Sequence, residues 1–106
     1  MKYDVIIIGA GPGGIFSAYE LTKHNENLKI AIFEEGHSLE KRHCPIDGKK
    51  ITSCIHCKSC SIMSGFGGAG AFSDGKYNIT NDFGGTLYEY IGKEKAIKLM
   101  HYVDDI

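Results

Sequence analysis

The chain has 106 residues, 42% of them hydrophobic, four cysteines and a formal charge of −1. This length has room for one small domain, and the near-neutral charge predicts no nucleic-acid partner. No apolar run reaches the roughly 20 residues of a membrane span, and Asp4 and Pro12 interrupt the apolar N-terminus. We therefore expect no membrane partner, no secretory signal, a cytoplasmic location and mostly reduced cysteines.

Residues 1–35 predict a strand, a glycine turn, a helix and a second strand. The continuous apolar run of residues 3–8 predicts a fully buried parallel strand. Residues 11–24 predict an amphipathic helix with Pro12 in its first turn, and residues 28–34 predict the second strand. The turn between the first strand and the helix consists of Gly9, Ala10, Gly11, Pro12, Gly13 and Gly14.

This turn has the G-x-G-x-x-G spacing of a dinucleotide-binding site. Gly9 allows a tight turn, Gly11 allows close approach of a diphosphate, and Gly14 allows the helix to pack on the strand. Glu34 closes the second strand and is placed to bind the ribose hydroxyls of an adenosine. The alternative is a glycine-rich loop without a ligand, but the strand, helix and acid around the motif favour a dinucleotide. NAD and FAD both fit, whereas Glu34 would repel the 2′-phosphate of NADP.

Two strands and one crossover helix do not complete a doubly wound sheet. We therefore expect an α/β fold that is the N-terminal part of a Rossmann-like FAD/NAD(P)-binding domain with an incomplete sheet. Its parts are a βαβ motif at 1–35, a cysteine- and glycine-rich loop at 36–76, and a short strand with helices at 77–106. A missing downstream domain or self-association would complete it.

The loop begins with a small basic cluster around Lys41 and Arg42. The cluster is either a solvated face or a contact for phosphate or adenosine near Glu34. Four cysteines follow, at Cys44, Cys54, Cys57 and Cys60.

The cysteine spacing leaves several chemistries open. The two overlapping C-x-x-C steps are typical of iron–sulfur ligation. Zinc is the rival, with His43 or His56 replacing a cysteine. A C-x-x-C redox pair beside Lys58 and four unligated thiols are the further alternatives.

A second glycine-rich stretch covers residues 64–76. Its end, Gly70-x4-Gly75-Lys76, resembles a P-loop, but Tyr77 replaces the Ser or Thr that would hold magnesium. The glycines suit a backbone that lies against a flat or charged ligand. The alternative is a flexible linker, although phenylalanines at 66 and 72 are unusual in linkers.

The last thirty residues predict a short strand at 77–80, a turn at 81–85 and two helices. Thr86 and Glu89 have capping-box spacing, which predicts a short helix that Gly92 ends. A second helix starts at Lys93, and its apolar side consists of Ala96, Leu99 or Met100, and Val103. Two acids at its C-terminus oppose the helix dipole, so we expect the helix to continue beyond residue 106 and the chain to be part of a longer protein.

Four stretches together resemble the N-terminal part of a bacterial FAD-dependent dehydrogenase family of Rossmann-type flavoproteins. They are residues 5–14, Glu34-Glu35-Gly36, Arg42 with Cys44-Pro45, and residues 64–76. The resemblance implies that Gly9, Gly11 and Gly14 receive the FAD diphosphate, that Glu34 binds the ribose, and that residues 65–75 pass near the flavin. The full implied cofactor set is Gly9, Ala10, Gly11, Pro12, Gly13, Gly14, Glu34, Glu35, Arg42, Gly67, Gly68, Ala69, Gly70 and Ser73.

Larger members of this family move hydride or electrons with FAD, and the flavin performs the chemistry. The resemblance therefore implies an oxidoreductase with FAD as cofactor, and NAD(H) is the alternative. The sequence identifies no catalytic residue. We expect the chain to be inactive as an enzyme on its own, and the alternative functions are a small cysteine-ligated iron–sulfur or zinc module and an inactive fragment.

Overall fold

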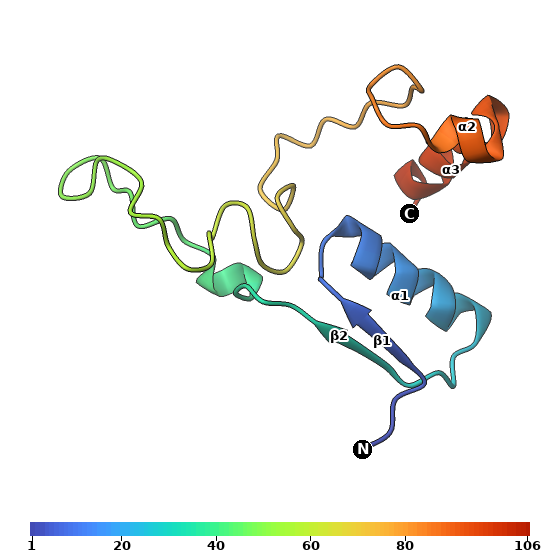
Figure 1. Ribbon diagram of the computed structural model, residues 1–106, viewed down its shortest axis with the longest axis horizontal. Coiled ribbons are helices and arrows are strands. Elements are labelled where there is room, and N and C mark those ends of the chain that lie inside the picture. The colour runs from blue at the N-terminus through green and yellow to red at the C-terminus, as the bar shows by residue number, and fades with distance from the viewer. The chain divides into compact units, whose positions relative to one another are not determined.

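The computed structural model describes residues 1–106, which divide into two compact units, Met1–Ser73 and Asp74–Ile106. The elements follow the order β1 (Val5–Ile8), α1 (Pro12–His24), β2 (Ile30–Phe33), the 3-10 helix η1 (Leu39–Lys41), α2 (Leu87–Ile91) and α3 (Lys93–Asp104) (Figure 1). None of these helices has the length and apolar composition that crossing a membrane requires.

The first unit is built on a βαβ motif. Strands β1 and β2 form a two-stranded parallel sheet, with Val5 opposite Ile30 and Ile8 opposite Phe33. The ladder continues past the strands, because the Gly9 amide donates to the Phe33 carbonyl at 2.7 Å. The predicted α/β fold with an incomplete parallel sheet is therefore present, and the strands are shorter than predicted.

The prediction of a fully buried first strand is wrong in this chain. Val5 and Ile7 are half-buried, whereas Ile6 is 59% exposed and Ile8 is 81% exposed. Side chains alternate between the two faces of a strand, and α1 covers one face of the sheet only. The continuous apolar run is typical of a strand covered on both faces.

Helix α1 starts and ends where the sequence predicts. Pro12 occupies its first turn, and the Ile15 amide donates to the Gly11 carbonyl at 3.0 Å. The helix ends at Asn25, whose amide donates to the Leu21 carbonyl at 2.9 Å. The predicted helix is confirmed.

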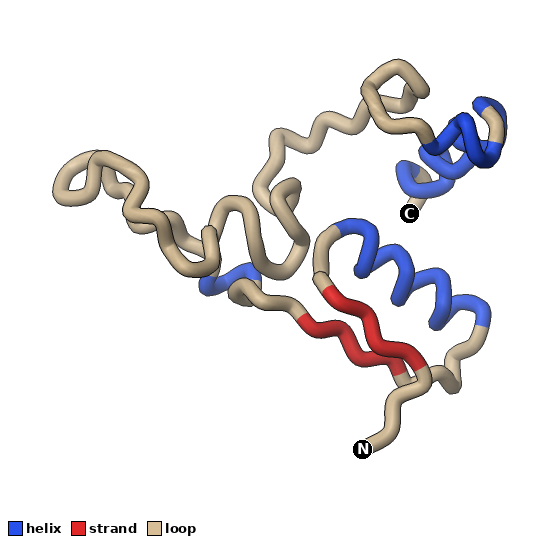
Figure 2. The backbone as a smooth tube through the Cα atoms, in the orientation of Figure 1, coloured by secondary structure: helices blue, strands red, loops and turns tan.

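Most of the chain between β2 and α2 is loop (Figure 2). Two hydrogen bonds fix residues 66–67: the Gly67 amide donates to the Ala10 carbonyl of the glycine turn at 2.8 Å, and the Phe66 amide donates to the carbonyl of His37, which follows the βαβ motif, at 3.0 Å. This part of the second glycine stretch is therefore fixed against the first, and the flexible-linker alternative is wrong for it.

The second unit consists of loop residues followed by α2 and α3. The predicted strand at 77–80 is absent, because no neighbouring strand supplies its hydrogen bonds. Helix α2 follows Thr86, but the predicted capping box does not form: the Thr86 side chain makes no cap hydrogen bond.

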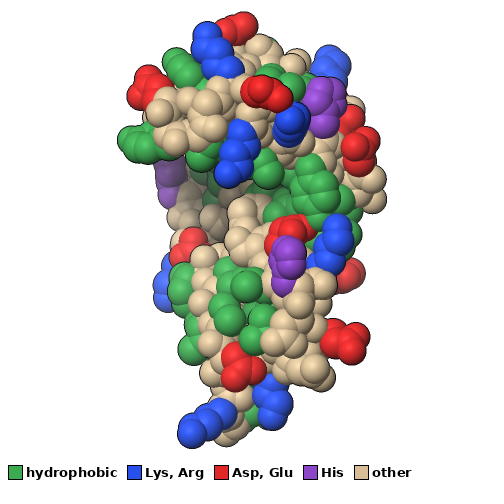
Figure 3. All heavy atoms as spheres, turned by 90° about the vertical axis from the view of Figure 1, so that its right-hand side faces the viewer, with side chains coloured by type: hydrophobic (Ala, Val, Ile, Leu, Met, Phe, Trp, Pro, Cys, Tyr) green, Lys and Arg blue, Asp and Glu red, His purple; other side chains and the backbone are tan.

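Gly92 ends α2 as predicted, with a φ of 85° that favours glycine. On α3, Ala96 is fully buried and Met100 and Val103 are half-buried, whereas Leu99 is 44% exposed. Of the two predicted alternatives, Met100 therefore lies on the inner side. Acidic, basic and apolar side chains are intermingled on the surface shown in Figure 3.

Candidate functional site

The glycine turn joins β1 to α1 at the carboxyl end of the sheet. Gly9 has a φ of 96°, a left-handed conformation that other residues rarely adopt. Ala10 is 1% exposed. A Cβ atom on Gly14 would overlap the Gly9 carbonyl oxygen. The roles predicted for Gly9 and Gly14 in turning and packing the chain therefore match the geometry.

The N-terminus of α1 suits an anion. Gly11 is its N-cap residue, no side chain caps it, and its first turn contains no acidic residue. The amide groups of the first turn lack partners within the helix, and the helix dipole favours negative charge there. A diphosphate would satisfy both requirements.

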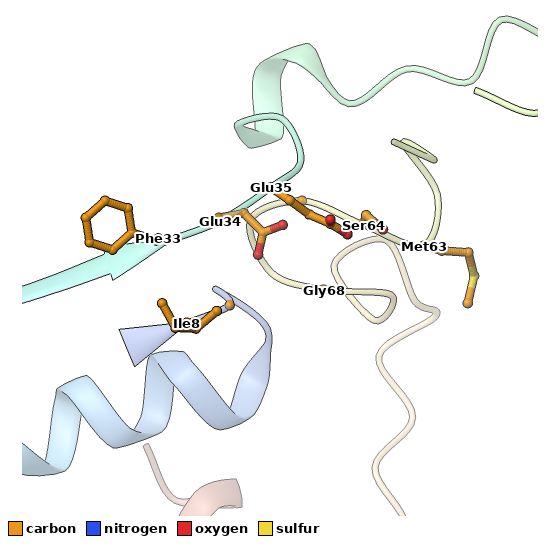
Figure 4. Close-up of a pocket in the computed structure, with 9 residues that line it drawn as sticks. Ile8, Phe33, Glu34, Glu35, Met63, Ser64 and Gly68 are labelled. Atoms are coloured by element: carbon orange, nitrogen blue, oxygen red, sulfur yellow. The ribbon is translucent and has the colours of Figure 1, made fainter. Parts of the chain in front are cut away.

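A pocket of about 380 Å³ opens beside this turn (Figure 4). It is lined by Ile8, Gly9, Phe33, Glu34, Glu35, Met63, Ser64, Gly65 and Gly68. Its walls therefore come from the ends of β1 and β2 and from the second glycine stretch. Ligands of open parallel sheets bind at the carboxyl ends of the strands, which is where this pocket lies.

Glu34 is held in place by the backbone around it. One carboxylate oxygen accepts a hydrogen bond from the Ala10 amide at 2.7 Å, and the other accepts one from the Gly36 amide at 2.9 Å. The bond from Ala10 contributes most to lowering the pKa of Glu34, followed by the bond from Gly36. The carboxylate is therefore charged at neutral pH and fixes the glycine turn to the end of β2.

This hydrogen bonding makes the stability of the chain depend on pH. The pKa of Glu34 is lowered in the folded state, so its contribution is present above the ordinary carboxyl pKa of about 4.5 and is lost as the pH falls through the folded value. We expect Glu34→Gln to be less stable than the unaltered chain at pH about 7 and to lose less further stability between pH about 5 and pH about 3. Urea unfolding at these pH values measures the difference.

A matched control for this experiment is Glu26→Gln. Glu26 is an exposed acid in the turn between α1 and β2. Its substitution should leave the pH dependence of the urea midpoint as it is in the unaltered chain. Parallel curves for Glu34→Gln and the unaltered chain would contradict the assignment.

The second glycine stretch packs against the first at glycine positions. A Cβ on Gly68 would lie 3.1 Å from both the Gly11 Cα and the Pro12 Cδ. A Cβ on Gly36 would lie 2.5 Å from the Gly65 nitrogen. The sequence predicted that this stretch lies against a ligand. In the structure, residues 65–68 pack against the chain's own backbone, including the glycine turn.

Arg42 connects these segments. It is 4% exposed, and its guanidinium donates to the carbonyls of Ser61, Ile62, Phe66 and Gly68 at 2.8–2.9 Å. The guanidinium also lies 5.2 Å from the centre of the Phe72 ring. The solvated-face alternative is wrong for Arg42, because four of its five N–H groups bind backbone carbonyls.

The structure brings together most of the predicted cofactor residues. The glycine turn, Glu34, Glu35, Gly67 and Gly68 lie at or beside the pocket. Ala69 and Gly70 are exposed, and the Ser73 amide donates to the Gly70 carbonyl in the following turn. Their contacts with a cofactor stay predictions.

The predicted cofactor set missed five residues that line this pocket: Ile8, Phe33, Met63, Ser64 and Gly65. Ile8 and Phe33 end the two apolar runs, so their position at the carboxyl ends of the strands was the available signal. Ser64 and Gly65 belong to the second glycine stretch, whereas Met63 precedes it and nothing in its residue type indicates a place in the pocket.

The four cysteines are free thiols that line a separate pocket of about 420 Å³. No three His, Cys, Asp or Glu side chains are arranged to hold a metal ion. The predicted iron–sulfur or zinc centre is therefore not supported, because the sequence spacing did not produce a convergent ligand set. Hydrogen bonds from the amides of Met63 and then Ile62 lower the pKa of the Cys60 thiol, and the charge of Arg42 adds to this effect.

Three known proteins are similar to parts of this chain. An uncharacterized protein of Clostridium beijerinckii is 34% identical over 76 residues, which are 72% of this chain and 14% of that protein. Thiamine thiazole synthase of Thermotoga maritima is 49% identical over 35 residues, which are 33% of this chain and 13% of that protein. Thiamine thiazole synthase 4, chloroplastic, of Physcomitrium patens is 53% identical over 32 residues, which are 30% of this chain and 9% of that protein.

The matched part of the chain is short compared with these relatives, of which it spans between 9% and 14%. No solved structure matches the chain. Residues 1–41, which contain β1, the glycine turn, α1, β2 and η1, match the Thi4 family, a Rossmann-type family related to flavoproteins.

Proposed function

We propose that this chain binds the ADP part of FAD and is the N-terminal portion of an FAD-dependent oxidoreductase. The observation that carries the proposal is the pocket at the carboxyl ends of β1 and β2, which the glycine turn and Glu34 border. In this arrangement the diphosphate lies at the N-terminus of α1 and the adenosine ribose lies beside Glu34.

The comparisons support a shared type of cofactor and not a shared reaction. The Thi4 match covers residues 1–41, which are the residues that form the βαβ motif and its glycine turn. These residues hold a dinucleotide, whereas the reaction depends on where the flavin meets its substrate. We therefore propose FAD binding for this chain on the basis of the match, and we do not propose thiazole synthesis for it.

FAD would supply the redox chemistry, and the residues of this chain would position it. Backbone amides of the α1 N-terminus would hold the diphosphate, and the Glu34 carboxylate would accept hydrogen bonds from the ribose while keeping those from Ala10 and Gly36. Gly65 and Gly68 would form another wall of the same pocket. The cytoplasmic location expected from the sequence is part of the same proposal.

Calorimetric titration of the full chain with FAD, ADP and FMN tests the proposal. ADP should compete with FAD for one site, because it contains the groups that the turn and Glu34 bind, and FMN should not compete. NAD is included, because Glu34 suits its adenosine ribose equally. Competition by FMN without competition by ADP, or no binding of FAD to the folded chain, would contradict the proposal.

Gly11→Ala separates binding from folding in this experiment. Gly11 has an extended backbone with φ −77°, and a Cβ there would meet only the Gly68 Cα, at an ordinary 3.9 Å. The variant should keep its unfolding midpoint and bind FAD at least tenfold more weakly, which is about 1.4 kcal/mol, because its methyl group occupies the approach of the diphosphate. Gly13→Ala is the matched control, since a Cβ there meets no atom within 4 Å, and it should bind FAD like the unaltered chain.

A further inference from the structure

The cysteine pocket is separate from the proposed cofactor site and has no part in that function. Its walls contain all four cysteines of the chain together with the apolar residues Pro45, Ile46, Ile55 and Ile62. All four cysteines are free thiols. A cavity of about 420 Å³ that is bordered by free thiols and apolar residues can admit a small disulfide, which a thiol can attack by disulfide exchange.

Cys60 differs from the other three in its surroundings. It is half-buried, whereas Cys44, Cys54 and Cys57 are exposed. Hydrogen bonding to the backbone at Met63, and then at Ile62, lowers the pKa of its thiol, and the positive charge of Arg42 adds to this effect. Amide donors and a neighbouring cation favour the thiolate form, which is the nucleophile in disulfide exchange. Cys60 is therefore the thiol best placed to attack.

Either of the two remaining C-x-x-C cysteines, Cys54 or Cys57, could form a disulfide with Cys60, and their surroundings differ. The Cys54 sulfur accepts a hydrogen bond from the His56 amide at 3.4 Å, and Cys54 lines the cysteine pocket only. Cys57 lines the cysteine pocket and also a second pocket, beside His37 and Lys58. A thiol that lines both cavities is accessible, so it can attack a mixed disulfide formed on Cys60. The spacing of Cys57 and Cys60 is also that of a C-x-x-C redox pair.

We propose that Cys57 and Cys60 form a dithiol site that reduces low-molecular-weight disulfides. The Cys60 thiolate attacks one sulfur of the disulfide, the S–S bond breaks, and the first thiol leaves after taking a proton from solvent. Cys57 then loses its proton to solvent and attacks the Cys60 sulfur, which releases the second thiol. The two cysteines are oxidised to one disulfide, and the small disulfide is reduced to two thiols, so two electrons are transferred in all.

Peptide mapping of the full chain tests this pairing directly. The chain is incubated with excess glutathione disulfide, its remaining thiols are blocked with N-ethylmaleimide in acid, and it is digested with trypsin. Cleavage after Lys58 separates Cys54 and Cys57, which share peptide 51–58, from Cys60 in peptide 59–76, and fragmentation of the joined peptides shows which cysteine of peptide 51–58 is alkylated. We expect these two peptides to be joined by a Cys57–Cys60 disulfide, with Cys54 and Cys44 alkylated. Two glutathione molecules should be released for each disulfide formed.

Three variants assign the steps. Cys57→Ser should stop at a mixed disulfide on Cys60, because the second attack is lost. Cys60→Ser should release glutathione at least tenfold more slowly, and Ser53→Ala, a control at an exposed residue outside the pocket lining, should react like the unaltered chain. A disulfide confined to peptide 51–58, one joining peptide 43–49, or four unmodified thiols in the unaltered chain would overturn the proposal. The mapping of the unaltered chain requires no variant to fold, and its outcome does not depend on whether FAD binds.

Discussion

Gly14→Ala should lower the free energy of unfolding by about 3 kcal/mol, at the upper end of the cost of overpacking. The added Cβ would overlap the Gly9 carbonyl oxygen and would also lie 3.2 Å from the Ile7 Cγ2. Both neighbours belong to β1 and the turn that follows it, so α1 would have to move away from the sheet. The turn that we propose as the diphosphate site would be displaced with it. Urea unfolding followed by circular dichroism measures the loss, and FAD titration should show no binding.

Gly13→Ala again provides the control. It adds the same methyl group one residue earlier in α1, where no atom lies within 4 Å of the new Cβ. Because alanine is a better helix former than glycine, its stability should rise by less than about 1 kcal/mol. Equal unfolding midpoints for the two variants would mean that α1 does not pack on the turn through Gly14.

Arg42→Lys should destabilise the chain by roughly 2–4 kcal/mol even though it keeps the positive charge. The guanidinium binds four carbonyls in a planar arrangement, whereas an ammonium group has three donors and no fork. At least one of these partly buried carbonyls loses its partner, at a cost of about 1–3 kcal/mol, and the others are bound less well. Hydrogen exchange should accelerate at the Phe66 and Gly67 amides, whose hydrogen bonds fix this part of the second glycine stretch.

The neighbouring Lys41 provides the matched control. Lys41 is exposed at the end of η1. Lys41→Arg makes the reverse substitution one residue away, and it should change neither the unfolding midpoint nor the exchange rates. If Arg42→Lys leaves the Phe66 and Gly67 amides as protected as before, Arg42 does not hold the second glycine stretch in place.

The βαβ motif was predictable because its signals are local. Pro12 in the first helical turn, the glycine spacing and the acid after the second apolar run each act within a few residues, and the structure contains the helix and the parallel pair that they predict. Strand burial was not predictable in the same way. An apolar run indicates that both faces of a strand are suited to burial. It does not indicate which helices or strands are present to cover those faces.

The role of Arg42 was not predictable, because it depends on carbonyls about twenty or more residues away in the sequence. A basic residue between Lys41 and His43 has the same local pattern whether it faces solvent, a phosphate or the backbone of a distant loop. The cysteines present the same difficulty. Their spacing is compatible with a metal cluster, but ligation requires convergence in space, and loop conformation decides this.

The hydrogen bonds from the Arg42 side chain to the carbonyls of Ser61 and Ile62 also hold together the two ends of one loop. Residues 43–60, which carry every cysteine, leave the βαβ unit at Arg42 and return to it at the carbonyls that Arg42 binds. The two ends of this loop are therefore held together whatever residues lie between them. Doubling the length of such a closed loop costs only about 0.6 kcal/mol. The cysteine segment can thus change in length or sequence during evolution while the pocket beside the glycine turn keeps its shape, so the two proposed activities could diverge independently.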